Sequence, residues 1–239
     1  MISTLIWLDL YLLELGNRAA GSPWLDPMML FVSDFGNFKI PIILGALAIS
    51  WWGSPRQRVI LVMLGVAVAL TDMTGAAIKD LTDRPRPFHT LEIRQIEGLR
   101  YRSKSGSLPS NHAANCFAIA TFLSLTLQPR RRLGPILGMF AIASLVAYSR
   151  VYLGVHYPSD VILGALLGGA TGGLLANIFL SCFPCGTCPE GRPRWMPSRR
   201  VALLIAGLLL LGFVFLQGAK IISPERAVPE KTEVVAFRP

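Results

Sequence analysis

The sequence has few charged residues, and acidic ones are scarcest. Of its 239 residues, 15% are Asp, Glu, Lys or Arg and 52% are hydrophobic. Soluble domains carry about a quarter charged residues, so this composition argues against an ordinary soluble protein. Lys and Arg outnumber Asp and Glu by 23 to 14, but no basic run alternates with aromatic residues. That absence argues against nucleic-acid binding, and the composition indicates an integral membrane protein.

The N-terminus lacks the pattern of a secretory signal. Asp9 and Glu14 interrupt its apolar stretch, Leu5 to Leu13, and no basic region precedes it. The stretch is also short for a membrane span. We therefore expect a retained helix that lies in the membrane interface, followed by a second short helix around Pro27 to Phe35.

Cysteine is scarce as well, with four residues in the chain. Cys182, Cys185 and Cys188 form a C-x2-C-x2-C run, while Cys116 belongs to an apolar segment. Zinc and iron–sulfur sites usually need a fourth ligand, and none lies beside the run. The run is therefore either a metal site or a set of free thiols on a reducing cytoplasmic side. For the protein's activity we expect no cofactor.

Long apolar segments dominate what is present. A bilayer needs about 20 apolar residues in a helix. Six segments approach that length, at roughly 37–53, 57–79, 112–128, 133–153, 158–181 and 201–218. They predict an all-α, polytopic membrane bundle of about six transmembrane helices. The predicted organisation is N-terminal interfacial helices in residues 1–36, a transmembrane domain in residues 37–218, and a polar tail in residues 219–239.

The loops between these segments differ in charge. One set is rich in arginine: Arg56, Arg58, Arg130, Arg131, Arg132, Arg192, Arg194, Arg199 and Arg200. Because Lys and Arg concentrate in cytoplasmic loops, this set is expected to face the cytoplasm. The alternate loops, described next, are expected to face the periplasm or exterior of a bacterial inner membrane.

Three short motifs lie in those alternate loops. They are Lys79 with Arg86-Pro87, then Pro109-Ser110-Asn111-His112, then Ser149-Arg150 with His156 and Asp160. Together they offer three cations, two histidines and a carboxylate in a chain built for lipid. This combination predicts an enzyme that acts on a phosphorylated lipid.

The first two motifs are suited to hold phosphate. Arg86 stands between two prolines, which restrict its backbone, and Lys79 ends an apolar segment. Alternatively, both cations reach toward lipid headgroups. Ser110 and Asn111 stand at a predicted helix N-terminus, where free N–H groups and the helix dipole favour anions. His112 follows them and is placed to donate a proton.

The third motif pairs a histidine with a carboxylate. Pro158 is expected to open a helix, which puts Asp160 in its first turn and His156 just before it. A carboxylate in that position can hydrogen-bond one imidazole nitrogen and leave the other as nucleophile or base. Arg150 adds a further donor for phosphate.

In these motifs the chain resembles the type 2 phosphatidic acid phosphatase (PAP2) superfamily, whose pattern is KxxxxxxRP, PSGH and SRxxxxxHxxxD. The resemblance runs from about residue 57 to 181, with Asn111 where the family usually has glycine. It implies that His156 attacks phosphorus, His112 protonates the leaving group and Asp160 orients His156. Lys79, Arg86, Ser110, Asn111 and Arg150 would bind the phosphoryl oxygens, without a metal.

Several interpretations stay open at this point. Asp72, seven residues before Lys79 in a predicted span, either supports that lysine or bonds to Thr71 or Thr74. The loop between Arg86 and Pro109 is either a lid or a solvated segment. Undecaprenyl diphosphate is the first substrate choice; phosphatidylglycerol phosphate, phosphatidic acid and lipid A phosphate are alternatives. A lipid phosphotransferase and a non-catalytic lipid-phosphate binder or transporter also remain, and the oligomeric state is open.

Overall fold

The computed structural model describes residues 2–94, 96, 99, 105–127 and 133–183. Every regular element among these residues is helical. The α-helices are α1 (Ile2–Glu14), α2 (Asp26–Ser33), α3 (Lys39–Trp52), α4 (Pro55–Thr82), α5 (Pro87–Thr90), α6 (Asn111–Thr126), α7 (Leu133–Tyr152) and α8 (Pro158–Cys182). A π-helix, η1 (Leu15–Ala19), follows α1, and a 3-10 helix, η2 (Phe35–Phe38), follows α2.

Four helical segments of this described part are long and apolar enough to cross a membrane. They are Phe35–Trp52, Pro55–Thr90, Leu133–Tyr152 and Pro158–Cys182. These findings confirm the predicted all-α membrane bundle. The predicted span at 112–128 corresponds to α6, which has 16 residues and is not one of these four segments. The predicted span at 201–218 lies outside the described residues.

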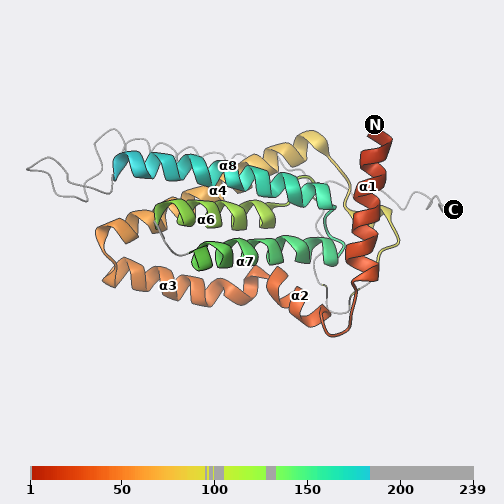
Figure 1. Ribbon diagram of the computed structural model, residues 1–239, viewed down its shortest axis with the longest axis horizontal. Coiled ribbons are helices and arrows are strands. Elements are labelled where there is room, and N and C mark those ends of the chain that lie inside the picture. Colours follow the sequence, from red (N-terminus) through yellow and green to blue (C-terminus); the bar gives the residue numbers. More distant parts are fainter. Residues whose placement is uncertain (1, 95, 97–98, 100–104, 128–132, 184–239) are drawn as a thin grey trace, which may run out of the picture.

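Five helices, α3, α4, α6, α7 and α8, run alongside one another, and successive helices reverse direction (Figure 1). The C-terminal ends of α4 and α7 therefore meet the N-terminal ends of α6 and α8. Helix α1 lies across this same end of the bundle. The three motifs gather there because each occupies one of these helix ends, so this end is called the site end below. The opposite end, called the far end, holds the short connection between α3 and α4.

Glycines on α8 bring it unusually close to α6. Gly164, Gly168 and Gly172 recur every four residues and therefore share one helix face. A β-carbon at Gly168 would lie 2.1 Å from the carbonyl oxygen of Ala114, and one at Gly164 would lie 2.4 Å from that of Ser110. Small residues at this spacing let membrane helices pack backbone to backbone. This contact holds the start of α6 against the start of α8, where motifs two and three lie.

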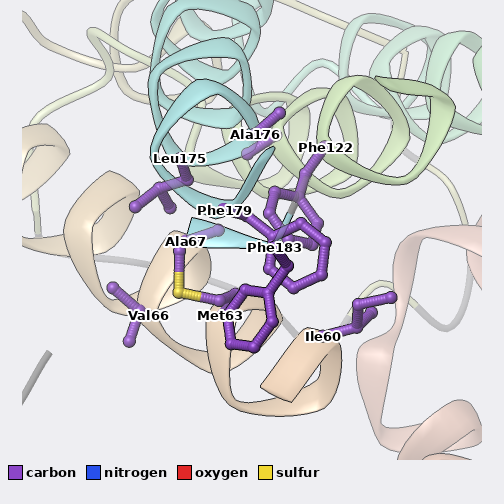
Figure 2. Close-up of a cluster of buried hydrophobic side chains, with 10 residues drawn as sticks. Ile60, Met63, Val66, Ala67, Phe122, Leu175, Ala176, Phe179 and Phe183 are labelled. Carbon is purple, nitrogen blue, oxygen red and sulfur yellow. The ribbon is translucent and has the colours of Figure 1, made fainter. Parts of the chain in front are cut away.

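The far end is filled by an apolar cluster (Figure 2). Its buried members come from α4, α6 and α8 and the residue after α8: Ile60, Met63, Val66, Ala67, Ala118, Phe122, Leu175, Ala176, Phe179 and Phe183. The Phe122 and Phe179 rings meet edge to face, with centroids 5.9 Å apart. The cluster fixes the spacing of the three helices that converge on the site.

Tryptophans mark both ends of the bundle. Trp51 and Trp52 close α3 at the far end and are 78% and 81% exposed. Trp24 precedes α2 and is 89% exposed. Tryptophan is enriched where hydrocarbon meets the headgroups. Their positions fit a bundle whose two ends lie near the two membrane surfaces.

Candidate active site

All eight residues predicted for the site lie at the site end. Lys79 is in the last turn of α4 and Arg150 in the last turn of α7. Arg86 is the N-cap of α5, Ser110 is the N-cap of α6, and Asn111 and His112 begin α6. His156 lies between α7 and α8, and Asp160 is in the first turn of α8. Six of these side chains are buried: Lys79, Arg86, Ser110, Arg150, His156 and Asp160.

The contact between Arg86 and His156 determines the proton position on the imidazole. Nη1 of Arg86 lies 3.2 Å from Nε2 of His156. Because a guanidinium only donates, Nε2 must accept and therefore carries a lone pair. The ring proton is then on Nδ1, which lies 3.4 Å from Oδ2 of Asp160. Such contacts are often long in unliganded sites and shorten when substrate binds.

Backbone carbonyls hold Arg86 in this orientation. Its Nε donates to the carbonyl of Ser105 at 3.0 Å, and Nη1 donates to the carbonyl of Val155 at 3.2 Å. Nη2 donates to the carbonyl of Gly106 at 3.3 Å. The end of the loop between motifs one and two therefore wraps the guanidinium. Ile96, in the middle of that loop, is also buried; residues 95, 97–98 and 100–104 lie outside the described part.

Ser110 joins the second motif to the third through the backbone. Its N–H donates to the carbonyl oxygen of Asp160 at 3.0 Å. Its hydroxyl is fully buried, and the described residues provide it with no hydrogen-bond partner. Buried hydroxyls normally have a partner. An oxygen of a bound phosphoryl group would supply one.

Asn111 connects Lys79 to an acidic residue within α4, one of the segments long and apolar enough to cross a membrane. The Lys79 ammonium donates to Oδ1 of Asn111, while Nδ2 of Asn111 donates to Oδ1 of Asp72 at 2.9 Å. Asn115 donates to the same carboxylate oxygen at 3.1 Å. Asp72 thus supports Lys79, which was one of the two interpretations of Asp72. The support passes through the side-chain amide of Asn111. This contact depends on the residue at which the chain departs from the family pattern.

The segment that joins α2 to α3 reaches two site residues. Nη1 of Arg150 donates to the hydroxyl of Ser33, and the Phe35 ring stacks on the His112 ring at 4.8 Å. Sequence reasoning missed both contacts, because Ser33 and Phe35 belong to no motif. It also missed Ser107, whose hydroxyl donates to Oδ2 of Asp160.

His156 is held in its neutral form. Burial, together with the positive charges of Arg86 and Arg150, lowers the pKa of His156 to about 4, against the opposing effect of Asp160. A neutral imidazole has a free lone pair at ordinary pH. The buried ring is therefore available as a nucleophile without first losing a proton.

The family model described as the PAP2 superfamily matches residues 60–184. The chain belongs to the PAP2 superfamily. YbjG of Escherichia coli (strain K12) is 31% identical over 176 residues, which cover 72% of this chain and 82% of YbjG. The lipid A 4'-phosphatase of Bacteroides thetaiotaomicron is 32% identical, covering 62% of this chain and 70% of that protein. The undecaprenyl-diphosphatase of Sulfolobus acidocaldarius is 35% identical, covering 60% and 66% respectively.

Solved PAP2 structures share the fold. LpxE of Aquifex aeolicus matches with a TM-score of 0.58 and 27% identity, covering 71% of this chain and 95% of that one. A transmembrane PAP2 type phosphatidylglycerolphosphate phosphatase from Bacillus subtilis matches with a TM-score of 0.56 and 26% identity, covering 74% and 87% respectively. The present protein is thus an integral membrane hydrolase of the PAP2 lipid phosphatase family.

The cysteine run stays undecided in this PAP2 protein. Cys182 ends α8 as a free thiol, and Cys116 is a free thiol on α6. Cys185 and Cys188 lie outside the described residues. Both interpretations of the run therefore remain predictions.

Proposed function

We propose that this protein removes the terminal phosphate of undecaprenyl diphosphate at the outer face of the membrane, through a phosphohistidine at His156 and without a metal. The observation that carries the proposal is the position of His156 between Arg86 and Asp160. Arg86 contacts the unprotonated Nε2, and Asp160 faces the protonated Nδ1. Nucleophile and phosphate-binding cation are therefore neighbours.

In the first step the Nε2 lone pair attacks the terminal phosphorus. The bond from phosphorus to the bridging oxygen breaks, and His112 gives a proton to that oxygen. Asp160 stabilises the charge that develops on the ring, as the carboxylate does in catalytic triads. In the second step water attacks phosphorus, His112 takes its proton, and the P–N bond breaks to release phosphate.

The charges around the site support metal independence. In this proposal Lys79, Arg86 and Arg150 bind the phosphoryl oxygens, together with the hydroxyl of Ser110 and the N–H of Asn111. Fixed donors and cations stabilise the charge that spreads over a transferring phosphoryl group. In a buried site they act more strongly than in water.

The proposed orientation and domain organisation rest on where arginines and helix ends lie. Arg56 and Arg58 begin α4 at the far end, while the motifs lie at the site end. With Lys and Arg enriched on the cytoplasmic side, the site faces the periplasm or exterior of a bacterial inner membrane. We also propose interfacial helices in residues 1–36, the phosphatase domain in residues 37–218 and a polar tail in residues 219–239.

The substrate choice draws on the relatives. One is named an undecaprenyl-diphosphatase and another a lipid A 4'-phosphatase. Undecaprenyl diphosphate offers a phosphate leaving group, and its long apolar chain suits a protein that lies in the membrane. Lipid A phosphate is the second candidate, with phosphatidylglycerol phosphate and phosphatidic acid as further substrates to test.

The test measures phosphate release from each of the four lipids by detergent-purified protein in excess EDTA. Undecaprenyl diphosphate should be hydrolysed fastest, His156→Ala should abolish release, and His89→Ala, which changes an exposed histidine, should not. Brief reaction with labelled substrate should leave acid-labile label on the protein. Faster release from lipid A would replace the substrate; no release from any lipid would favour the phosphotransferase or the binder.

A further inference from the structure

Arg84 stands two residues before Arg86 in the same motif, yet its guanidinium binds carboxylates. Its Nη1 donates to Oδ1 of Asp160 at 2.7 Å, and its Nη2 donates to Oδ2 of Asp9 at 2.6 Å. Its guanidinium carbon lies 4.0 Å from the centre of the Tyr157 ring. One cation thus joins the carboxylate beside His156 to a carboxylate on the N-terminal helix.

Asp9 binds the start of α8 as well as Arg84. Its Oδ1 accepts from the N–H of Ser159 at 2.8 Å, and its Oδ2 accepts from the Ser159 hydroxyl at 2.6 Å. Ser159 is in the first turn of α8, where N–H groups lack partners within the helix. Negative charge at a helix N-terminus is also favoured by the dipole. Asp9 therefore ties α1 to the helix that carries Asp160.

The Asp160 carboxylate depends on these partners because it is fully buried. Oδ2 accepts from the Ser107 hydroxyl and from the N–H of Tyr157 at 2.9 Å, and it faces the His156 ring. Oδ1 accepts from Arg84. A buried carboxylate without a cation is costly and tends to take up a proton or to turn away. Arg84 supplies that cation at Oδ1, while the imidazole of His156 faces Oδ2.

We propose that Arg84 and Asp9 are positioning residues for the catalytic pair: Arg84 keeps Asp160 ionised and facing His156, and Asp9 keeps Arg84 in place. Residues 1–59 precede the segment that the family model matches. The N-terminal helix thereby contributes to the active site from outside that segment. The inference rests on the proposed roles of His156 and Asp160.

A second arginine provides a matched control. Arg94 binds both oxygens of Asp26, at 2.7 and 3.0 Å, and lies over the Tyr152 ring. Like Arg84, it therefore binds a carboxylate of the N-terminal region and lies against a tyrosine ring. The arginine side chains of the two pairs are 29% and 25% exposed. Within the described part of the chain, Arg94 contacts Asn17, Asp26 and Tyr152 and none of the eight site residues, so its loss reports N-terminal docking alone.

The kinetic test compares Arg84→Gln, Arg84→Lys, Asp9→Asn and Arg94→Gln in the full chain. Arg84→Gln should lower kcat by about 10- to 100-fold, the usual range for residues that orient a catalytic ligand. Its KM should stay within about threefold, since Asp160 does not bind the substrate phosphate. Arg84→Lys should recover part of the loss, and Arg94→Gln should retain kcat within about threefold.

Coupling between Asp9 and Arg84 separates positioning from general destabilisation. If Asp9 acts through Arg84, the double variant Asp9→Asn/Arg84→Gln should be no slower than Arg84→Gln alone. Losses that simply multiply would overturn the role of Asp9. An Arg94→Gln loss equal to that of Arg84→Gln would overturn the positioning role and indicate docking of the N-terminus.

A titration of the His156 ring needs no substrate and so tests the inference even if the proposed function fails. The charged or titratable groups near this ring are Arg86, Arg150 on α7, His112 on α6 and Asp160 on α8. Removing the Arg84 charge should lower the pKa of His156 below about 4, because an Asp160 carboxylate that takes up a proton or turns away no longer stabilises the charged ring. NMR of ring-labelled histidine measures it, with His156→Gln for assignment. An unchanged pKa in Arg84→Gln, with a folded protein by thermal unfolding, would overturn the inference.

Discussion

At the far end of the bundle, α4, α6 and α8 meet mainly through apolar side chains, whereas at the site end the same helices meet through charged and hydrogen-bonding groups. Phe122 and Phe179 are typical of the first region. Arg84, Asp160 and His156 are typical of the second. Both regions are buried, but apolar contacts tolerate many partners and ionic contacts need one partner in one orientation.

The difference separates stability from chemistry. Apolar burial stabilises the fold in proportion to area, with little dependence on which apolar residue supplies it. The buried charges at the site end cost desolvation and are compensated only by their assigned partners. Substitutions at the far end should therefore change unfolding first, and those at the site end should change turnover first.

Phe122→Ala is expected to have the largest effect of the substitutions and conditions compared here. The Phe122 side chain is fully buried at the centre of the far-end cluster. Its truncation should lower the free energy of unfolding by about 3–5 kcal/mol, the usual cost of replacing a buried phenylalanine by alanine. Turnover per folded molecule should remain that of the wild type.

Reversible unfolding in mixed micelles measures the loss, and Leu125→Ala is the control. Leu125 lies on the same helix but is 46% exposed, so its truncation removes little buried area. A large drop in turnover for folded Phe122→Ala would contradict the separation between the two ends.

Acid conditions should destabilise the site end next. The pKa of His156 is about 4 in the folded protein, because of burial, against an ordinary value of 6.5. Between these values the unfolded chain binds a proton that the folded chain does not. Stability therefore rises with pH across this window, and it is lost as the pH falls from about 6.5 toward 4, by up to about 1.4 kcal/mol per pH unit.

Unfolding midpoints of the wild type and His156→Gln across this pH range isolate the contribution of the ring. The difference in stability between the two proteins should change with pH in the expected direction. Parallel curves would show that the ring titrates alike in the folded and unfolded protein.

The sequence predicted the long apolar helices well, for a physical reason. Bilayer thickness fixes the apolar length, so the predicted segments 133–153 and 158–181 differ by a residue from α7 and α8. The motif residues could be selected because few types of side chain can bind a phosphate, attack phosphorus or transfer a proton. The match to the family confirms the membership that those motifs predicted.

The supporting contacts could not be predicted in this way. Asp9 and Ser159 are 150 positions apart, and no spacing rule relates them. The interruption of an apolar stretch by Asp9 was a signal, but it indicated an interfacial helix and not a partner for Arg84. Ser33 and Phe35 gave no signal, since their roles arise from how α2 packs.

Asn111→Gly should have the smallest effect, although it restores the residue usual in the family. The Asn111 amide accepts a hydrogen bond from Lys79 and donates one to Asp72, so it links the ammonium to the carboxylate and sets the distance between them. Without it both charges remain, but nothing fixes their separation. We expect kcat/KM to fall by about tenfold or less, as for the loss of one hydrogen bond of ordinary strength, with little change in unfolding.

Gly75→Ala tests the same contact from the opposite helix. A β-carbon at Gly75 would lie 2.5 Å from Oδ1 of Asn111, so the amide must move away from Lys79. Gly65→Ala on the same helix is the control, since no atom lies within 4 Å of its β-carbon position. If Gly75→Ala lowers kcat/KM as Asn111→Gly does, and the double variant Gly75→Ala/Asn111→Gly is no worse, the amide acts by position. Full activity of Asn111→Gly would mean that Lys79 needs no second residue to hold it, and that the two ends of the bundle differ less in specificity than their contacts imply.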